Sequence, residues 1–159
     1  MPTNWPHDDT TSLIAFYGKP WEDTSLLTHV PPPFVMKYEG TQIHGILIHV
    51  KVADALLAAL NAAWTFYGKD QAQIDASGLS NYSGSYNYRN VRGASSLSCH
   101  AFGAAVDIDA EHNPMYYNPN VVPCRMPSPV VNAFVSNGAT WGGSFQHRVD
   151  KMHFQYAHE

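Results

Sequence analysis

The segment SCHAFGAAVDID, residues 98–109, constrains the fold more than any other part of the chain. It places three ionisable side chains, His100, Asp107 and Asp109, within an apolar run. Seven residues separate His100 from Asp107, a rise of about 10.5 Å on a helix and about 23 Å on a straight strand. Side chains so far apart meet only if the chain bends between them, and Gly103 adopts positive φ freely. We therefore predict a bend at Gly103.

The residues that follow the bend predict a strand, because apolar and polar positions alternate in AAVDID, residues 104–109. The face expected to lie against the core carries Ala104, Val106 and Ile108. The opposite face carries Ala105, Asp107 and Asp109. Because successive side chains of a strand point to opposite faces, either aspartate can be the partner of His100 at a metal ion. The spacing alone leaves both open.

The C-terminal segment DKMHFQYAH, residues 150–158, contains a second set of polar residues. Alternation predicts a strand whose core-facing side chains are Met152, Phe154 and Tyr156. The opposite face then carries His153 and Gln155. Asp150 is expected in the turn that follows WGGSF, residues 141–145, where a carboxylate can deprotonate a water molecule at a metal ion.

Two histidines and one aspartate suit a catalytic zinc ion, and we expect one Zn²⁺ per chain. Three protein ligands leave a fourth tetrahedral position open for water, whereas structural zinc sites usually fill all four positions with Cys and His. The two cysteines, Cys99 and Cys124, are too few for a cysteine cluster. In a reducing cytosol we expect them to remain unpaired.

The remaining pattern predicts an α+β fold, a single domain over residues 1–159 with a small antiparallel sheet and flanking helices. Two shorter helices are expected. One lies within residues 8–20, capped by Thr10 or Thr11 and stopped by Gly18 and Pro20, and the other is N-capped by Ser128 and ends at Gly138. The long helix of the core is expected over residues 51–67. The other expected segments are an extended connection over 29–34, a hairpin within 34–50 turning at Glu39-Gly40, and a polar loop or irregular strands over 79–96.

The composition argues against several classes of partner. A formal charge of −4 does not suit nucleic acid, which needs a clustered cationic surface. No apolar run reaches the ~20 residues of a membrane span. The N-terminus shows no basic region followed by an apolar stretch, so we expect synthesis in the cytoplasm without a signal peptide. We also expect a monomer.

Three motifs of this chain resemble the M15 family of zinc metallopeptidases, the D-Ala-D-Ala carboxypeptidase and L-alanyl-D-glutamate endopeptidase group. SCHAFGAAVD, residues 98–107, matches the family pattern S-x-H-x-x-G-x-A-x-D, and DKMH, residues 150–153, matches a carboxylate followed by x-x-H. SGSYNYR, residues 83–89, resembles the family's S-G-Y-R segment with two residues added. The short form with WGGSF before Asp150 looks like the phage endolysin-like branch.

The resemblance implies a role for individual residues of this chain. His100, Asp107 and His153 would be the zinc ligands, which favours Asp107 over Asp109. Asp150 would be the catalytic base. Arg89, with Arg92 as the alternative because of the two added residues, would bind a substrate carboxylate or the developing oxyanion. Ser98 would support the first motif from outside the ligand set, and His147, close to Asp150, is a candidate substrate contact.

The resemblance also implies a hedgehog/DD-peptidase-like zinc peptidase fold and a zinc-dependent peptidoglycan peptidase. The expected activity is that of an L-alanyl-D-glutamate endopeptidase, acting on the bacterial cell wall as a phage-type endolysin after release or delivery. The alternative within the enzyme class is a D-Ala-D-Ala carboxypeptidase or dipeptidase. The alternative from another class is a non-catalytic, zinc-stabilised wall-binding module, against which Asp150 argues because such a module needs no base.

Overall fold

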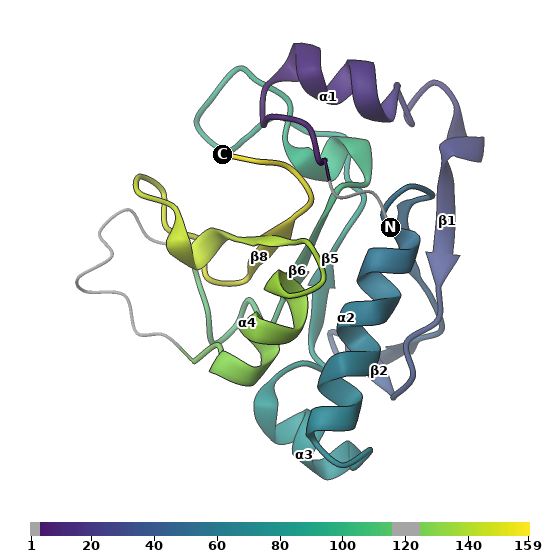
Figure 1. Cartoon of the computed structure of the whole chain (residues 1–159), viewed down its shortest axis with the longest axis vertical. Coiled ribbons are helices and arrows are strands. Elements are labelled where there is room, and N and C mark those ends of the chain that lie inside the picture. The colour runs from purple at the N-terminus through teal and green to yellow at the C-terminus, as the bar shows by residue number, and fades with distance from the viewer. Residues whose placement is uncertain (1–3, 116–124) are drawn as a thin grey trace.

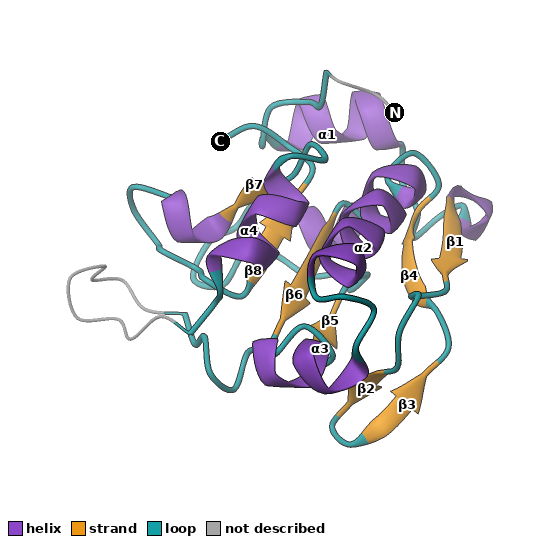
Figure 2. Ribbon diagram, turned by 60° about the horizontal axis from the view of Figure 1, so that its bottom comes forward, coloured by secondary structure: helices purple, strands orange, loops and turns teal. Residues whose placement is uncertain are grey.

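Helices and short antiparallel strands combine in an α+β arrangement, as the sequence predicts (Figures 1 and 2). The computed structural model describes residues 4–115 and 125–159, and Cys124 lies outside them. The α-helices are α1 (Thr10–Tyr17), α2 (Ala53–Phe66), α3 (Gln71–Ser77) and α4 (Ser128–Val135). The 3-10 helices are η1 (Thr24–Leu26), η2 (Cys99–Phe102) and η3 (Gly142–Ser144). The strands are β1 (Leu27–Val30), β2 (Met36–Tyr38), β3 (Thr41–Ile43), β4 (Ile46–His49), β5 (Tyr82–Gly84), β6 (Ala105–Ile108), β7 (Thr140–Trp141) and β8 (His153–Gln155).

The largest sheet in the described residues has four strands in the order β5-β6-β8-β7. Its two central strands, β6 and β8, are antiparallel, and their register sets Asp107 directly opposite His153. Helices α2 and α4 pack together and lie across one face of this sheet (Figures 1 and 2). Phe134 of α4 stacks on Phe154 of β8 with 4.2 Å between ring centroids. Because side chains alternate along a strand, Asp107 and His153 point to the face opposite these helices.

Helix α2 forms within the predicted range 51–67, and its apolar stripe is the centre of the core. The fully buried positions of the helix are Ala55, Leu56, Ala59, Leu60 and Ala63. Burying each of the two leucines contributes about 1.5–3 kcal/mol. The backbone turns away at Gly68, whose φ is 71°. The prediction of a core helix is confirmed.

Both shorter helices begin at a residue other than the predicted cap. At α1 the cap is Asp9, whose extended backbone lets its carboxylate accept a hydrogen bond from the Ser12 amide at 2.8 Å. Thr10 and Thr11 lie inside the helix, so the prediction that one of them caps it was wrong. Ser128 is likewise the first helical residue of α4 and its side chain makes no cap hydrogen bond, because the extended residue is Pro127.

The hairpin predicted within 34–50 is shorter than expected. Strands β2 and β3 turn at Glu39 and Gly40, whose φ values are 48° and 84°, which confirms the turn. The next strand, β4, leaves this hairpin and pairs with β1. Residues 29 and 30, predicted as part of an extended connection, therefore belong to a sheet. Helix α3, which the sequence analysis missed, begins after an Asp70 cap and ends at Gly78.

Gly103 makes the predicted bend, and two neighbours lie too close for any other residue. It follows η2 with φ 65° and ψ 28°, in the left-handed region, and the chain then enters β6. A Cβ atom at this position would lie 2.8 Å from the backbone nitrogen of His49 and 2.8 Å from Cδ2 of Leu27. Leu27 of β1 and His49 of β4 thus lie directly against the bend.

Replacing Gly103 by Ala is expected to destabilise the protein more than the same change at Gly68. Both glycines have positive φ, a strain of about 1–2 kcal/mol for Ala. A Cβ at Gly68 meets nothing within 4 Å, whereas the overpacking at Gly103 adds about 1–3 kcal/mol. Urea unfolding of both variants measures the difference, and equal losses of unfolding free energy would contradict the close approach.

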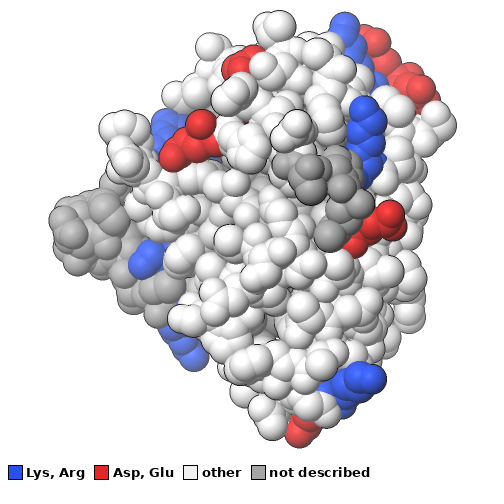
Figure 3. Space-filling view, in the orientation of Figure 1, with Lys and Arg blue, Asp and Glu red and all other residues white. Residues whose placement is uncertain are grey.

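On the face drawn in Figure 3, Lys and Arg side chains of the described residues lie at separate points and form no single patch. Within residues 4–115 and 125–159, no helix has both the length and the apolar character needed to cross a membrane.

Candidate metal and catalytic site

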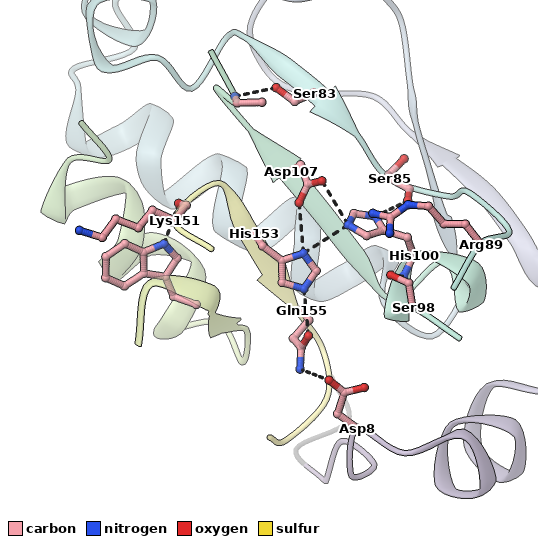
Figure 4. Close-up of polar contacts among 12 residues, drawn as sticks. Asp8, Ser83, Ser85, Arg89, Ser98, His100, Asp107, Lys151, His153 and Gln155 are labelled. Atoms are coloured by element: carbon pink, nitrogen blue, oxygen red, sulfur yellow. Dashed lines mark hydrogen bonds and ion pairs between the residues drawn. The ribbon is translucent and has the colours of Figure 1, made fainter. Parts of the chain in front are cut away.

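Strands β6 and β8 and the bend at Gly103 bring three predicted side chains to one point, where they face one another (Figure 4). His100 Nε2 lies 3.2 Å from Oδ2 of Asp107 and 3.2 Å from Nδ1 of His153. His153 Nδ1 lies 3.1 Å from Oδ1 of Asp107. All three residues are largely buried. The seven-residue gap between His100 and Asp107 is therefore closed by the bend.

Each histidine ring has one nitrogen that points away from the cluster, the outward nitrogen, and this nitrogen is hydrogen-bonded to an oxygen acceptor. His100 Nδ1 lies 2.6 Å from the carbonyl oxygen of Ser85, and His153 Nε2 lies 2.9 Å from Oε1 of Gln155. Each outward nitrogen therefore donates its hydrogen, which leaves the inward nitrogen free to bind a metal ion. Histidine ligands of metals commonly have such an outer acceptor. In the described part of the chain, His100, Asp107 and His153 offer donor atoms within 4.8 Å of one another, and the set fits zinc.

Asp109 does not join this cluster. Its φ of 52° takes it out of the β6 alternation. Its carboxylate accepts hydrogen bonds from the side chains of Asn81 at 2.9 Å and His112 at 2.8 Å. A Cβ at Gly78 would lie 2.4 Å from Oδ2 of Asp109, so the carboxylate is packed against the end of α3. Of the two aspartates that the spacing left open, Asp107 alone lies with the histidines.

Without a metal ion, the surroundings of His153 favour its protonated form. Burial alone lowers the pKa of His153, but hydrogen bonding and charge from Asp107, and the charge of Asp150, raise it to about 9. Burial raises the pKa of Asp107, yet His100 and His153 together hold it well below its usual range. The proton on His153 Nδ1 thus occupies the side of the ring that would face a metal ion.

Zinc binding is therefore expected to release about one proton per ion at pH values of about 7–8. The metal needs neutral His153, whose pKa of about 9 keeps it protonated there. Affinity should rise about tenfold per pH unit towards pH 9 and then level off. Calorimetric titration in buffers of different ionisation enthalpy counts the protons. Binding without proton release would contradict the proposed proton at His153.

Asp150 lies beside the cluster in the turn before β8, as the sequence predicts. Its backbone NH donates to the Gly142 carbonyl at 2.9 Å, and a Cβ at Gly142 would lie 2.3 Å from the Asp150 carbonyl oxygen. Among the described residues, no hydrogen-bond partner reaches the buried Oδ1 of Asp150. Burial raises the pKa of this carboxyl, with His153 acting against the shift and Asp107 reinforcing it. A carboxylate in this state is ready to take a proton.

The other predicted residues surround a cavity of about 290 Å³ that the cluster and Asp150 also line. The guanidinium groups of Arg89, Arg92 and Arg148 lie on its wall, and His147 lines the cavity beside them. Arg89 donates to the carbonyl of Asn90 at 3.2 Å, and the Arg92 carbonyl accepts from the Arg148 guanidinium. The cavity therefore combines a place for a cation with a cationic rim, which suits a substrate that carries a carboxylate.

Ser98 lies just before η2 and holds the backbone of His100 in place. Its hydroxyl oxygen accepts a hydrogen bond from the backbone NH of His100 at 3.2 Å. The Ser98 amide in turn donates to the carbonyl of Arg89 at 3.0 Å. Ser98 thus links the backbone of Arg89 to the backbone of His100.

Sequence reasoning missed three residues outside the cluster that support it: Ser85 and Gln155 contact its histidines, and Asp8 contacts Gln155. Ser85 acts through its backbone carbonyl, so its side chain gave no signal. Gln155 was placed on the correct face of the last strand, but the pattern did not show that it would contact His153. Asp8 reaches the site from the far end of the chain, and its carboxylate accepts from the Gln155 amide at 3.2 Å.

Comparison with known proteins bears on residues 92–156, which include the whole cluster and Asp150. This segment matches the profile of an M15 peptidase family described as D-alanyl-D-alanine carboxypeptidase. Searches of the curated proteins and of the solved structures found no match. The match supports a peptidase that acts on peptidoglycan-related substrates in general. Over this segment, the chain is similar to the M15 peptidase family.

Proposed function

We propose that the protein is a zinc-dependent peptidoglycan peptidase that cleaves stem peptides, an L-alanyl-D-glutamate endopeptidase acting as a phage-type endolysin. The observation that carries this proposal is the buried Oδ1 of Asp150, which has no hydrogen-bond partner among residues 4–115 and 125–159 and lies on the cavity where three metal-donor side chains converge. A hedgehog/DD-peptidase-like fold and action on the wall after release or delivery belong to the same proposal.

The chain's own residues would hold the ion and orient it. His100 through Nε2, His153 through Nδ1 and Asp107 through its carboxylate would be the ligands, and Ser85 and Gln155 fix the two rings from behind. A zinc ion in such a site polarises a carbonyl and lowers the pKa of water from 15.7 to about 7. Ligand geometry therefore depends on side chains that are already hydrogen-bonded in place.

Asp150 would carry the proton through the reaction. Its Oδ1 takes a proton from the attacking water and returns it to the leaving amine, so one carboxyl acts as base and then as acid. Burial raises its pKa, which makes the protonated form accessible. Arg89 or Arg92 would stabilise the charge that develops on the scissile carbonyl oxygen or bind a substrate carboxylate.

The cationic rim also suits the D-Ala-D-Ala carboxypeptidase alternative. In both scissile bonds the residue on the amine side keeps a free carboxylate, which an arginine can bind. The wall-binding alternative leaves Asp150 without a role, although burying its Oδ1 with no hydrogen-bond partner among the described residues costs folding free energy.

Digestion of purified peptidoglycan by the zinc-loaded protein, followed by mass spectrometry, separates the three functions. The proposal predicts new L-alanine C-termini and D-glutamate N-termini on the stem peptides. Release of free D-alanine would instead identify a carboxypeptidase. Unchanged muropeptides, with protein bound to the wall, would identify a binding module and overturn the proposal.

A further inference from the structure

We propose that Asp8, outside the family-matched segment 92–156, is a positioning residue for the metal site. It would act through Gln155 on His153 and so set the affinity for zinc, an inference that rests on the proposed function. Figure 4 shows the three side chains in sequence, with Asp8 contacting Gln155 and Gln155 contacting His153.

The amide of Gln155 has one orientation that satisfies all its neighbours. Its Nε2 donates to Oδ2 of Asp8 at 3.2 Å and lies 3.3 Å from the carbonyl oxygen of Ala157. Both neighbours are acceptors, so the nitrogen must face them. The Oε1 atom then faces Nε2 of His153 at 2.9 Å and accepts its hydrogen. The inward Nδ1 of His153 is thereby presented to the metal.

Asp8 is itself held firmly by both ends of the chain. Its backbone NH donates to the His158 carbonyl at 2.7 Å, and the His158 NH donates to the Pro6 carbonyl at 2.8 Å. Its other carboxylate oxygen, Oδ1, accepts from the thiol of Cys99 at 3.3 Å. Burial raises the pKa of the Cys99 thiol, and Asp8 raises it further, so the thiol keeps the hydrogen that it donates.

A carboxylate is needed at position 8 because both of its neighbours are donors. An ionised aspartate offers only acceptors, whereas asparagine presents one acceptor and one donor group. In Asp8→Asn, therefore, either the thiol or the Gln155 amide faces a donor. If the Gln155 amide rotates in response, its NH₂ group faces His153 Nε2. That ring must then carry its hydrogen on Nδ1, the nitrogen that a metal ion requires.

The test is a double-mutant cycle on the full chain, with zinc affinity measured by chelator competition. Asp8→Asn is expected to weaken zinc binding by about 3- to 10-fold, the loss of one oriented hydrogen bond. Gln155→Leu is expected to weaken it by about 10- to 100-fold. In the double variant the Asp8 change should add nothing beyond about twofold, because its effect passes through Gln155.

Asp9→Asn is the matched control, since it removes the same charge one residue away. Asp9 is exposed and caps α1 through Ser12, a role that asparagine fills equally well. Its zinc affinity should equal that of the wild type. A general effect of charge or stability would lower the zinc affinity of both variants, whereas a positioning role lowers the zinc affinity of Asp8→Asn only.

A second readout needs no metal. In the metal-free protein, the side-chain NH₂ resonances of Gln155 should be protected from exchange, and Asp8→Asn should remove that protection. If wild-type protein binds no zinc, the proposed function fails. If the wild type binds zinc and the Asp8→Asn variant binds it equally tightly, the inference about Asp8 fails while the proposed function stands. The same holds if Asp8→Asn weakens zinc binding by the same factor in the wild type and in Gln155→Leu.

Discussion

Replacing Asp150 by Asn is expected to reduce stem-peptide hydrolysis by about 10²- to 10⁴-fold, the contribution of a general base, while zinc binding changes little. Asn keeps the shape of the side chain but cannot accept a proton. Asp150 is not one of the three converging donor residues, and its Oδ1 has no partner among the described residues. The substitution therefore removes the proton carrier and leaves the metal ligands in place.

The measurement is the initial rate of muropeptide release by the zinc-loaded variant, with its zinc content determined on the same sample. Asp23→Asn is a suitable control, because Asp23 is exposed, caps η1 through Ser25 and is not among the residues that line the cavity. It should retain the wild-type rate. An Asp150→Asn protein that hydrolyses stem peptides at a rate near that of the wild type would overturn the assignment of the base.

Replacing Asp107 by Asn is expected to weaken zinc binding and to abolish hydrolysis. The loss of affinity should exceed about 100-fold, the upper end of the effect of removing a residue that only hydrogen-bonds a ligand. The change removes the negative charge that lies 3.1 Å and 3.2 Å from the two histidine nitrogens. The same change should let the pKa of His153 fall from about 9, because Asp107 supports the protonated ring.

Asp109→Asn is the control that distinguishes the two aspartates of segment 98–109. Asp109 contacts Asn81 and His112, so its substitution should lower stability but leave zinc affinity unchanged. Competition with a chelator measures the affinity, and NMR titration of the metal-free protein measures the pKa of His153. Loss of zinc binding in Asp109→Asn, with retention in Asp107→Asn, would reverse the choice of ligand.

The sequence predicted those parts of the site that depend on local pattern. Alternation identified the strand after Gly103 and the faces of β6 and β8, because polar and apolar side chains alternate along both strands. The helix around Leu56 and Leu60 was equally clear from its apolar stripe. Spacing alone could not choose between Asp107 and Asp109, since that choice depends on where β6 ends and the backbone of Asp109 turns to positive φ.

Long-range contacts were out of reach of pattern reasoning. Asp8 joins the site through the pairing of the two chain ends at His158, and neither end carries a motif for it. The backbone carbonyl of Ser85 binds His100 through an atom that every residue has. The pairing of β4 with β1, and not with the β2–β3 hairpin, also depends on tertiary contacts. It buries Val30 and Ile46, which lie opposite each other. Cap positions differed by one residue because several adjacent residues can cap a helix.

The most direct test of the proposed metal site is a crystal structure of the zinc-loaded protein with anomalous data at the zinc edge. We expect one zinc ion per chain, bound by Nε2 of His100, Nδ1 of His153 and the carboxylate of Asp107. Asp150 should lie beside the ion without binding it. An ion held by other residues, or no ion at this cluster under saturating zinc, would contradict the proposed metal site.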